Sequence, residues 1–189
     1  MTDFSSAFEC RLASQRIWVD CSGANPTDEL DRVCRIFLRQ GLCVAVLDDC
    51  PGSLISNISI LENLWLPHAW HHGLSRSQFQ AQLAGLVDVM SPLLSKSVSD
   101  MYELLRRRPG EVSSQQRSLF VLMRAVLMSP ELVLLSSAWI SGLVDSSGQM
   151  LLKMMHNSLS TASWLAFDEI EPNVDILSAG WSRTQLLYF

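Results

Sequence analysis

The sequence predicts a single α/β domain over residues 1–189 with a mostly parallel sheet. Short apolar runs alternate with segments of helical periodicity, in the manner of βαβ units. The strand-like runs are rich in Val, Leu and Ile without polar alternation, which is typical of parallel strands buried on both faces. With 189 residues, 48% of them hydrophobic, the chain is long enough for one substantial core. No repeat or Pro/Gly-rich linker divides it.

Five runs have the composition expected of strands. They are Arg16–Asp20, Leu42–Asp48, Leu132–Ser136, Ser163–Phe167 and Gln185–Phe189.

Helices are expected between these runs. Asp28–Arg39 has apolar residues at the spacing of an amphipathic helix, and Gly41 is expected to end it. Three further helices each open on a Ser, which is a good N-cap: Ser75–Met90, Ser113–Met128 and Ser146–Leu159. Residues 60–111 contain only helix and loop patterns, so we expect them to form a helical lobe inserted within the domain.

Composition excludes several classes of function. The net charge is −5 and the basic residues are scattered, apart from Arg106–Arg108, which we interpret as a solvated patch, so no nucleic-acid partner is expected. No apolar run is long enough to span a bilayer and no signal peptide is recognisable, so a cytoplasmic protein is expected.

The five cysteines, all within the first 50 residues, match no metal or redox spacing and are expected to be reduced and mostly buried. Six Trp and eight Met suggest apolar surface for a permanent partner.

The stretch from Val112 to Trp139, VSSQQRSLFVLMRAVLMSPELVLLSSAW, resembles the ATPase subunit of ABC transporters in the order and spacing of its motifs. In that family a signature loop, a helix with an Arg-Ala-Leu step, a Pro-Glu-Leu turn and an apolar strand ending in Asp-Glu follow one another. The signature positions are Ser113, Ser114, Gln115 and Gln116 here, and the Asp-Glu pair is replaced by Ser136 and Ser137.

Two upstream segments extend the resemblance. Leu54–Pro67 is similar to the segment after the family's Q-loop, especially in lipid- and lipoprotein-transport members. Ile17–Thr27 sits like a phosphate-binding P-loop, with Ser22, Gly23, Ala24 and Thr27 at matching places. The short distance from there to Leu54 implies that the adenine-stacking β-subdomain is largely missing. The resemblance therefore implies a reduced P-loop NTPase fold.

The residues that carry the family's chemistry are replaced. Pro26 stands at the P-loop Lys, which supplies positive charge at the phosphates, and Phe167 stands at the phosphate-sensing His. Ser136 and Ser137 lack the charge that holds magnesium and polarises water. We therefore expect no ATPase activity, no cofactor and no metal, and we expect Thr27 to be the N-cap of the helix that follows.

Other candidate sites are weaker. His68, His71 and His72 form HxxHH, but no carboxylate or cysteine close in sequence completes a ligand set. The signature-like residues could still cap a nucleotide held by a second, intact subunit, because this loop acts across the interface of family dimers.

The resemblance predicts a catalytically inactive ABC-ATPase-like subunit with an assembly or regulatory role in a membrane transport complex, with lipid as the substrate that Leu61–Pro67 suggests. Its expected partner is a membrane permease subunit, an intact ABC ATPase subunit, or both, which would place it at the inner face of the cell membrane. Trp65, Leu66, Trp70 and Phe79 are the candidate partner contacts, although internal packing explains Trp65, Leu66 and Phe79 equally well. Two alternatives stay open: a nucleotide-binding ATPase completed by a partner's residues, and a free-standing regulatory module.

Overall fold

The computed structural model describes residues 16–21, 23–48, 53–73, 75–93, 96–136, 139, 154, 157–168 and 182–185. In chain order the elements are β1 (Arg16–Asp20), α2 (Pro26–Arg39), β2 (Val44–Leu47), α3 (Ile60–His72), α4 (Arg76–Leu93), α5 (Val98–Arg106), the 3₁₀ helix η2 (Pro109–Glu111), α6 (Ser114–Met128), β3 (Leu132–Ser136), β4 (Ser163–Asp168) and β5 (Ser182–Gln185).

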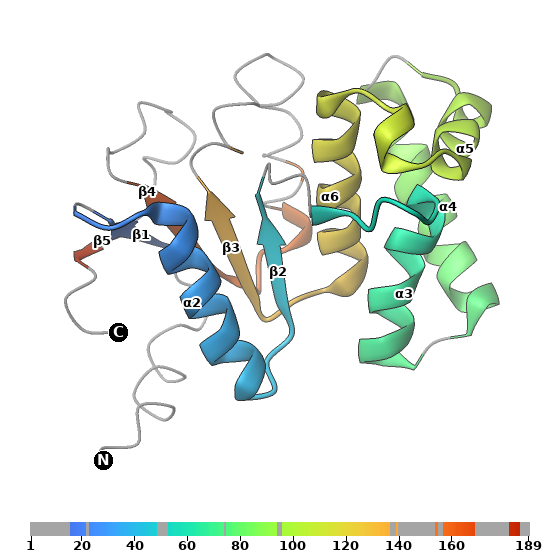
Figure 1. The fold of residues 1–189 in the computed structure, drawn as a ribbon. Helices are drawn as coiled ribbons and strands as arrows, with labels where there is room; N and C mark the ends of the chain where they lie inside the picture. The colour runs from blue at the N-terminus through green and yellow to red at the C-terminus, as the bar shows by residue number, and fades with distance from the viewer. Residues whose placement is uncertain are drawn as a thin grey trace.

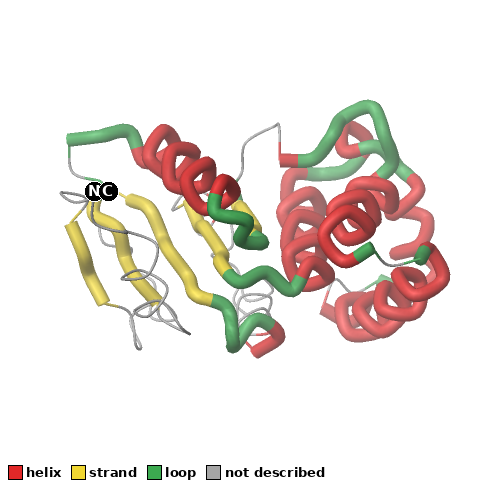
Figure 2. The backbone as a smooth tube through the Cα atoms, turned by 90° about the horizontal axis from the view of Figure 1, so that it is seen from below, coloured by secondary structure: helices red, strands yellow, loops and turns green. Residues whose placement is uncertain are grey.

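The five strands form one sheet in the order β2-β3-β4-β1-β5, and every neighbouring pair is parallel. This confirms the predicted α/β class. Helix α2 covers one face of the sheet, and α6 lies on the other side, between the sheet and the helices α3 to α5 (Figures 1 and 2). Residues 60–111 thus form a helical layer that reaches the sheet through α6, whose contacts include β2 and α3.

Alternate residues of β1 to β4 point into two separate cores, as strand geometry requires. On the α2 side, Val19, Leu134 and Phe167 pack against Leu30 and other residues of α2. On the α6 side, the other strand positions join a larger cluster that continues into the helical layer. Because both faces are covered, β2, β3 and most of β1 and β4 are apolar, which is why these runs lack polar alternation.

β1 to β4 match the predicted runs apart from their ends, whereas β5 shares only Gln185 with its predicted run. β1 and β3 have the predicted bounds, whereas β2 is shorter than Leu42–Asp48. β5 begins at Ser182, three residues before the predicted start at Gln185, and residues 186–189 lie outside the described part of the chain. Most of the predicted helix Ser146–Leu159 also lies outside it.

The helix ends follow local capping chemistry. Ser59, Ser97 and Ser113 each accept a hydrogen bond from the third residue of the helix, whose side chain returns the interaction. After α2, the N–H of Gly41 bonds the Leu38 carbonyl and that of Leu42 bonds the Phe37 carbonyl, which completes a Schellman motif. The φ angle of Gly41, +84°, confirms the predicted role of this glycine.

In the continuous stretch 23–48, α2 passes directly into β2 with no strand between them. This part of the domain therefore contains no additional strands, as the short distance between the P-loop-like segment and Leu54 predicts.

Candidate functional site

All the strands are parallel, so their carboxyl ends meet at one edge of the sheet, which is where open α/β folds bind ligands. Asp20 ends β1, Ser136 ends β3 and Asp168 ends β4, while Asp48 directly follows β2. The residues that the sequence aligns with a nucleotide site therefore do come together at this edge. What they offer a nucleotide depends on their hydrogen bonds and charges.

Three positions of the turn from β1 into α2, Ala24, Pro26 and Thr27, have no backbone donor to spare. The Ala24 N–H bonds the Cys21 carbonyl at 2.8 Å, and the Thr27 N–H bonds the Asn25 side-chain oxygen at 3.0 Å. Pro26, at the first helical position, has no N–H. A phosphate at a helix N-terminus is held by such donors, and these three positions offer it none.

Asn25, not Thr27, is the N-cap of α2, which corrects the sequence-based expectation. The reason is Pro26: proline is favoured at the first helical position, and it moves the start of the helix two residues earlier than the apolar periodicity suggests. Thr27 is then an exposed residue inside the first turn. Ser22, also matched to the P-loop, lies outside the described residues.

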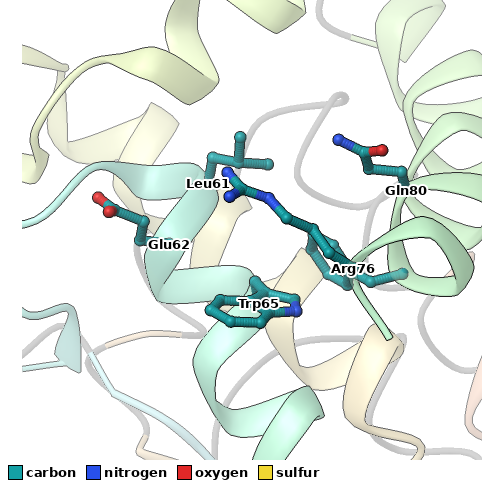
Figure 3. A pocket seen from close by; sticks show the side chains of 6 residues that line it. Leu61, Glu62, Trp65, Arg76 and Gln80 are labelled. Atoms are coloured by element: carbon teal, nitrogen blue, oxygen red, sulfur yellow. The ribbon is translucent and has the colours of Figure 1, made fainter. Parts of the chain in front are cut away.

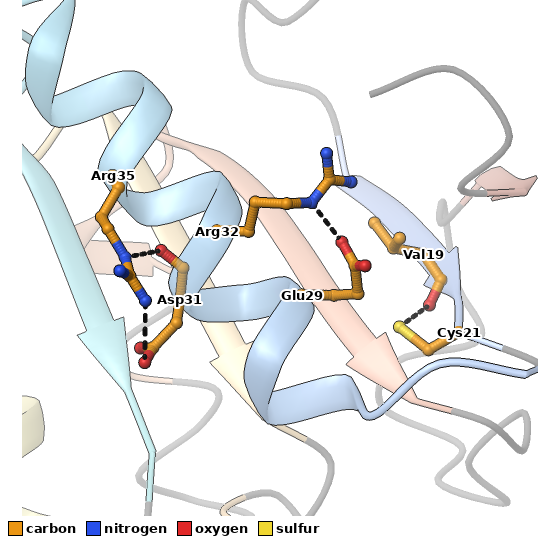
Figure 4. Close-up of polar contacts among 6 residues, drawn as sticks. All are labelled: Val19, Cys21, Glu29, Asp31, Arg32 and Arg35. Carbon is orange, nitrogen blue, oxygen red and sulfur yellow. Dashed lines mark hydrogen bonds and ion pairs between the residues drawn. The ribbon is translucent and has the colours of Figure 1, made fainter.

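Acidic side chains stand at this helix end. Asp28 and Glu29 lie in the first turn of α2, where negative charge stabilises the helix dipole. Glu29 forms an ion pair with Arg32 at 2.7 Å, and Asp31 lies 3.8 Å from Arg35 one turn further on (Figure 4). The positive end of α2 is thus already compensated by the protein's own carboxylates.

The end of β3 is a structural hydrogen-bond junction. The buried Ser136 hydroxyl donates to the Asp48 carboxylate at 2.7 Å and accepts from the Trp139 N–H at 3.2 Å. It therefore ties the ends of β2 and β3 to the segment after β3. Ser137 lies outside the described residues.

Phe167 is fully buried in β4, within the core under α2. Its register partners are Ser136 on β3 and Val19 on β1. An aromatic hydrocarbon at this position can neither sense nor bind a phosphate.

The signature-like segment forms the start of α6. Ser113 caps the helix by accepting from the Gln116 N–H at 3.2 Å, and the Gln116 side chain accepts from the Ser113 N–H at 3.0 Å. Ser114 and Gln115 follow in the first turn, which contains no acidic residue, unlike that of α2.

Comparison with known proteins gives its result at the level of structure. A solved structure described as the dimeric structure of MJ0796, a bacterial ABC transporter cassette, is similar to this chain at a TM-score of 0.62 and 14% identity, over 92% of this chain and 82% of its own. This chain has the fold of an ABC transporter cassette. A structure described as the ATP binding subunit of an ABC transporter matches at 20% identity and a TM-score of 0.46, over 65% of this chain but only 47% of its own length. No protein-family model and no curated protein matches the chain.

Within this cassette fold, α3 presents the predicted partner residues in different ways. Trp70 is 88% exposed and Leu66 is 38% exposed, one helical turn apart on the outward side of α3. Trp65 is half-buried and packs against the main core. Phe79 is 1% exposed, so its predicted contact with a partner is wrong: it is a core residue of α4.

Trp65 belongs to a small open pocket between α3 and α4, lined by Leu61, Glu62, Trp65, Arg76, Phe79 and Gln80 (Figure 3). The Arg76 guanidinium lies 5.8 Å from the centre of the Trp65 ring, a cation–π distance. The carboxylate of Glu62 is held by the N–H and hydroxyl of Ser59, and these hydrogen bonds lower the pKa of Glu62.

The composition therefore exaggerates the apolar surface. Trp18, Trp139 and Trp164 are buried, as are Met90 and Met101, so most large apolar residues of the described chain build the cores. Trp70 is the most exposed of the described large apolar residues, and Leu38, Ile55, Leu66, Val89 and Val98 are exposed to a smaller extent.

Two polar anchors were missed by the sequence reasoning. Asn63, 1% exposed, accepts from the Ile55 N–H at 2.6 Å and donates to the carbonyls of Ile55 and Ser59 at 3.0 Å each. Arg124 on α6 donates to the Ser53 carbonyl, and burial lowers the pKa of its guanidinium. Both hold the loop before α3. In the sequence, each could have been recognised as a polar residue at a position where helical periodicity places buried residues.

The histidines, cysteines and apolar helices add no further candidate site among the described residues. Within the described ranges no group of three or more His, Cys, Asp or Glu side chains is arranged to hold a metal. Among the described cysteines, Cys21 is buried whereas Cys34 and Cys43 are only partly buried, although most of the five were expected to be buried; Cys10 and Cys50 lie outside the described residues. Burial, followed by the nearby Asp31, raises the pKa of Cys34. No described helix has both the length and the apolar character to cross a membrane.

Proposed function

We propose that this chain is an ABC-cassette-like subunit that acts by binding protein partners and does not hydrolyse ATP. The observation that carries the proposal is the β1–α2 turn. The Ala24 and Thr27 N–H groups are bonded within the turn, Pro26 has none, and Asp28 and Glu29 stand where a polyphosphate would bring several negative charges. Coulomb repulsion and the loss of donors act in the same direction, against nucleotide.

The carboxyl edge of the sheet supports the same proposal for the hydrolytic step. A hydroxyl at the end of β3, already bonded to Asp48, supplies no charge to hold magnesium or to polarise a water molecule. Phe167 supplies no hydrogen bond. Several independent parts of the catalytic apparatus are therefore replaced, while the apolar framework that positions them is retained.

The partner surface is the outward side of α3. Leu66 and Trp70 form an exposed apolar patch on α3, whose opposite side is buried in the main core. Exposed aromatic residues are enriched at protein interfaces and often dominate their energetics. By the resemblance of the segment that precedes and includes α3, the partner is a membrane permease subunit, an intact ABC ATPase subunit, or both, in a complex at the inner face of the membrane. The lipid-transport resemblance of Leu61–Pro67 makes lipid the substrate class to test first.

Calorimetric titration with magnesium and ATP tests the catalytic half of the proposal. We expect no binding tighter than about 1 mM, which corresponds to about −4 kcal/mol. Binding in the micromolar range by the purified chain would overturn the proposal and favour an ATPase completed by a partner.

Membrane co-purification tests the partner half. The tagged chain is expected to retain a permease or an ATPase subunit, and Trp70→Ala is expected to lose it. Leu38→Ala is the matched control, because Leu38 is also an exposed apolar residue, 48% exposed, but lies on α2 at the other face of the sheet. Equal retention by both variants would remove Trp70 from the interface, and a chain found only free of membranes would favour a regulatory module without a transporter.

A further inference from the structure

His68 is a buried histidine in the middle of the helical layer. It projects from α3, is 3% exposed, and neither of its ring nitrogens has a hydrogen-bond partner of good geometry among the described residues. Its ring lies 5.7 Å, centre to centre, from that of Phe79 on α4. A buried, unsatisfied imidazole is tolerated in its neutral form far better than in its charged form, because charge without a partner is costly in an apolar interior.

His72, one helical turn further along α3, occupies a different environment. It is exposed, and its Nε2–H donates to the carbonyl of Met128, the last residue of α6, at 2.7 Å. The carboxyl end of a helix stabilises positive charge. This contact holds the His72 ring at the carboxyl end of α6, with its centre 5.0 Å from that of His68.

The groups that face His68 come from three helices. They are His72 on its own helix, the neutral Gln82 side chain on α4 and the Leu127 carbonyl on α6. Burial lowers the pKa of His68, the charge of His72 lowers this pKa further, and the Leu127 carbonyl and Gln82 oppose the shift. Among the described residues no carboxylate contributes to it, so nothing there neutralises a proton on His68.

We propose that the His68–His72 pair is a proton-sensitive latch of the helical layer: while His68 is neutral, α3 stays packed on α4 and α6, and protonation of His68 releases it. No covalent step is involved. The proton comes from solvent and is accepted by the ring once α3 has opened. The latch goes beyond the proposed function and does not depend on it.

The direction of the pH dependence follows from linkage. A histidine whose pKa is lowered in the folded state binds its proton only after opening, so the packed state loses stability as the pH falls below the ordinary histidine pKa of about 6.5. One proton taken up on opening raises the opening constant by up to about tenfold for each pH unit, until the folded-state pKa is reached.

The test is amide hydrogen exchange of the whole chain at pH 7 and pH 5, corrected for the intrinsic exchange rates. We expect α3 and α4 to lose protection by up to about 25-fold between pH 7 and pH 5, while β1, β3 and β4 change little. His68→Leu, which keeps an apolar side chain of similar size, is expected to abolish the difference. His72→Gln, which keeps a donor for the Met128 carbonyl but removes the charge, is expected to reduce it. His71→Gln, an exposed histidine of the same helix, is the matched control and is expected to behave like the unmodified chain.

A second measurement decides the question even if His68→Leu does not fold. The chain has only four histidines, so each imidazole can be titrated by NMR in the unmodified protein and assigned with the His71→Gln and His72→Gln variants. A pKa for His68 clearly below 6.5, with α3 protection lost in the same pH range, supports the latch. A pKa at or above 6.5, an equal loss of protection in the sheet, or unchanged acid sensitivity in a folded His68→Leu variant overturns it.

Discussion

Two aromatic residues that the sequence places in one category should respond in opposite ways to truncation. Trp70 and Phe79 were both candidates for the partner surface, yet Trp70 is 88% exposed and Phe79 is 1% exposed. We predict that Phe79→Ala lowers the free energy of unfolding, and that any loss of partner binding follows from this loss of stability. Trp70→Ala should weaken partner binding without destabilising the fold.

The magnitudes follow from burial. Phe79 packs in the core shared by the sheet, α3, α4 and α6, where a Phe→Ala change typically costs about 3–5 kcal/mol through lost burial and the cavity left behind. Trp70 loses little buried area on truncation, so its effect on the free energy of unfolding should stay within about 0.5 kcal/mol. If Trp70 anchors the interface, its truncation to Ala should nevertheless cost about 2 kcal/mol or more of binding free energy, which corresponds to an about 30-fold weaker complex.

Urea unfolding and membrane co-purification measure the two effects. With a urea slope of about 2 kcal/mol per molar, Phe79→Ala should lower the unfolding midpoint by about 1.5–2.5 M and Trp70→Ala by no more than about 0.25 M. A Trp70→Ala midpoint lowered by 1 M or more would refute the assignment of Trp70 to the surface. Unchanged stability together with unchanged co-purification would show that Trp70 contributes to neither.

Three further predictions concern polar groups. Asn25→Ala should lower the free energy of unfolding by about 1 kcal/mol in urea melts by removing the cap of α2, while Asn25→Asp should retain most of it; equal effects would show that the cap does not stabilise the helix. Asn63→Ala should cost about 1–3 kcal/mol, because it leaves buried backbone groups of the preceding loop without partners, and a change below 0.5 kcal/mol would contradict this anchoring role. The double variant Ser136→Asp, Ser137→Glu should release no phosphate from ATP above a matched background, because catalytic groups act as a unit and the P-loop charge is still missing; clear turnover would mean that the nucleotide site lies elsewhere.

The sheet shows why some elements can be predicted to the residue. Arg16–Asp20 and Leu132–Ser136 are central strands buried on both faces, so polar residues or turns bound their apolar runs sharply. The start of α2 was misplaced because apolar periodicity reports the buried side of a helix, whereas Pro26 and its cap determine where the helix begins. The start of β5 was misplaced for a related reason: Ser182–Gln185 is polar, and only its pairing with β1 makes it a strand.

The candidate site divides in the same way. That Pro26, Ser136 and Phe167 stand at the positions of charged family residues is a prediction from the resemblance, made without coordinates. That the Asn25 oxygen occupies the Thr27 N–H, and that Ser136 donates to Asp48, required the structure, because those contacts depend on the geometry of a turn and on the adjacency of two strands.

By itself, the sequence determined the fold class, the parallel strands and the serine caps. These are local or compositional properties, and each is encoded in a short window of residues. Only the tertiary structure decided that Phe79 faces inward while Trp70 faces solvent, and that His68 is enclosed by α4 and α6 without a hydrogen-bond partner of good geometry among the described residues. Helical periodicity shows that a residue belongs to the apolar face of a helix, but it does not show which part of a broad apolar face is buried. The packing of the neighbouring helices determines that.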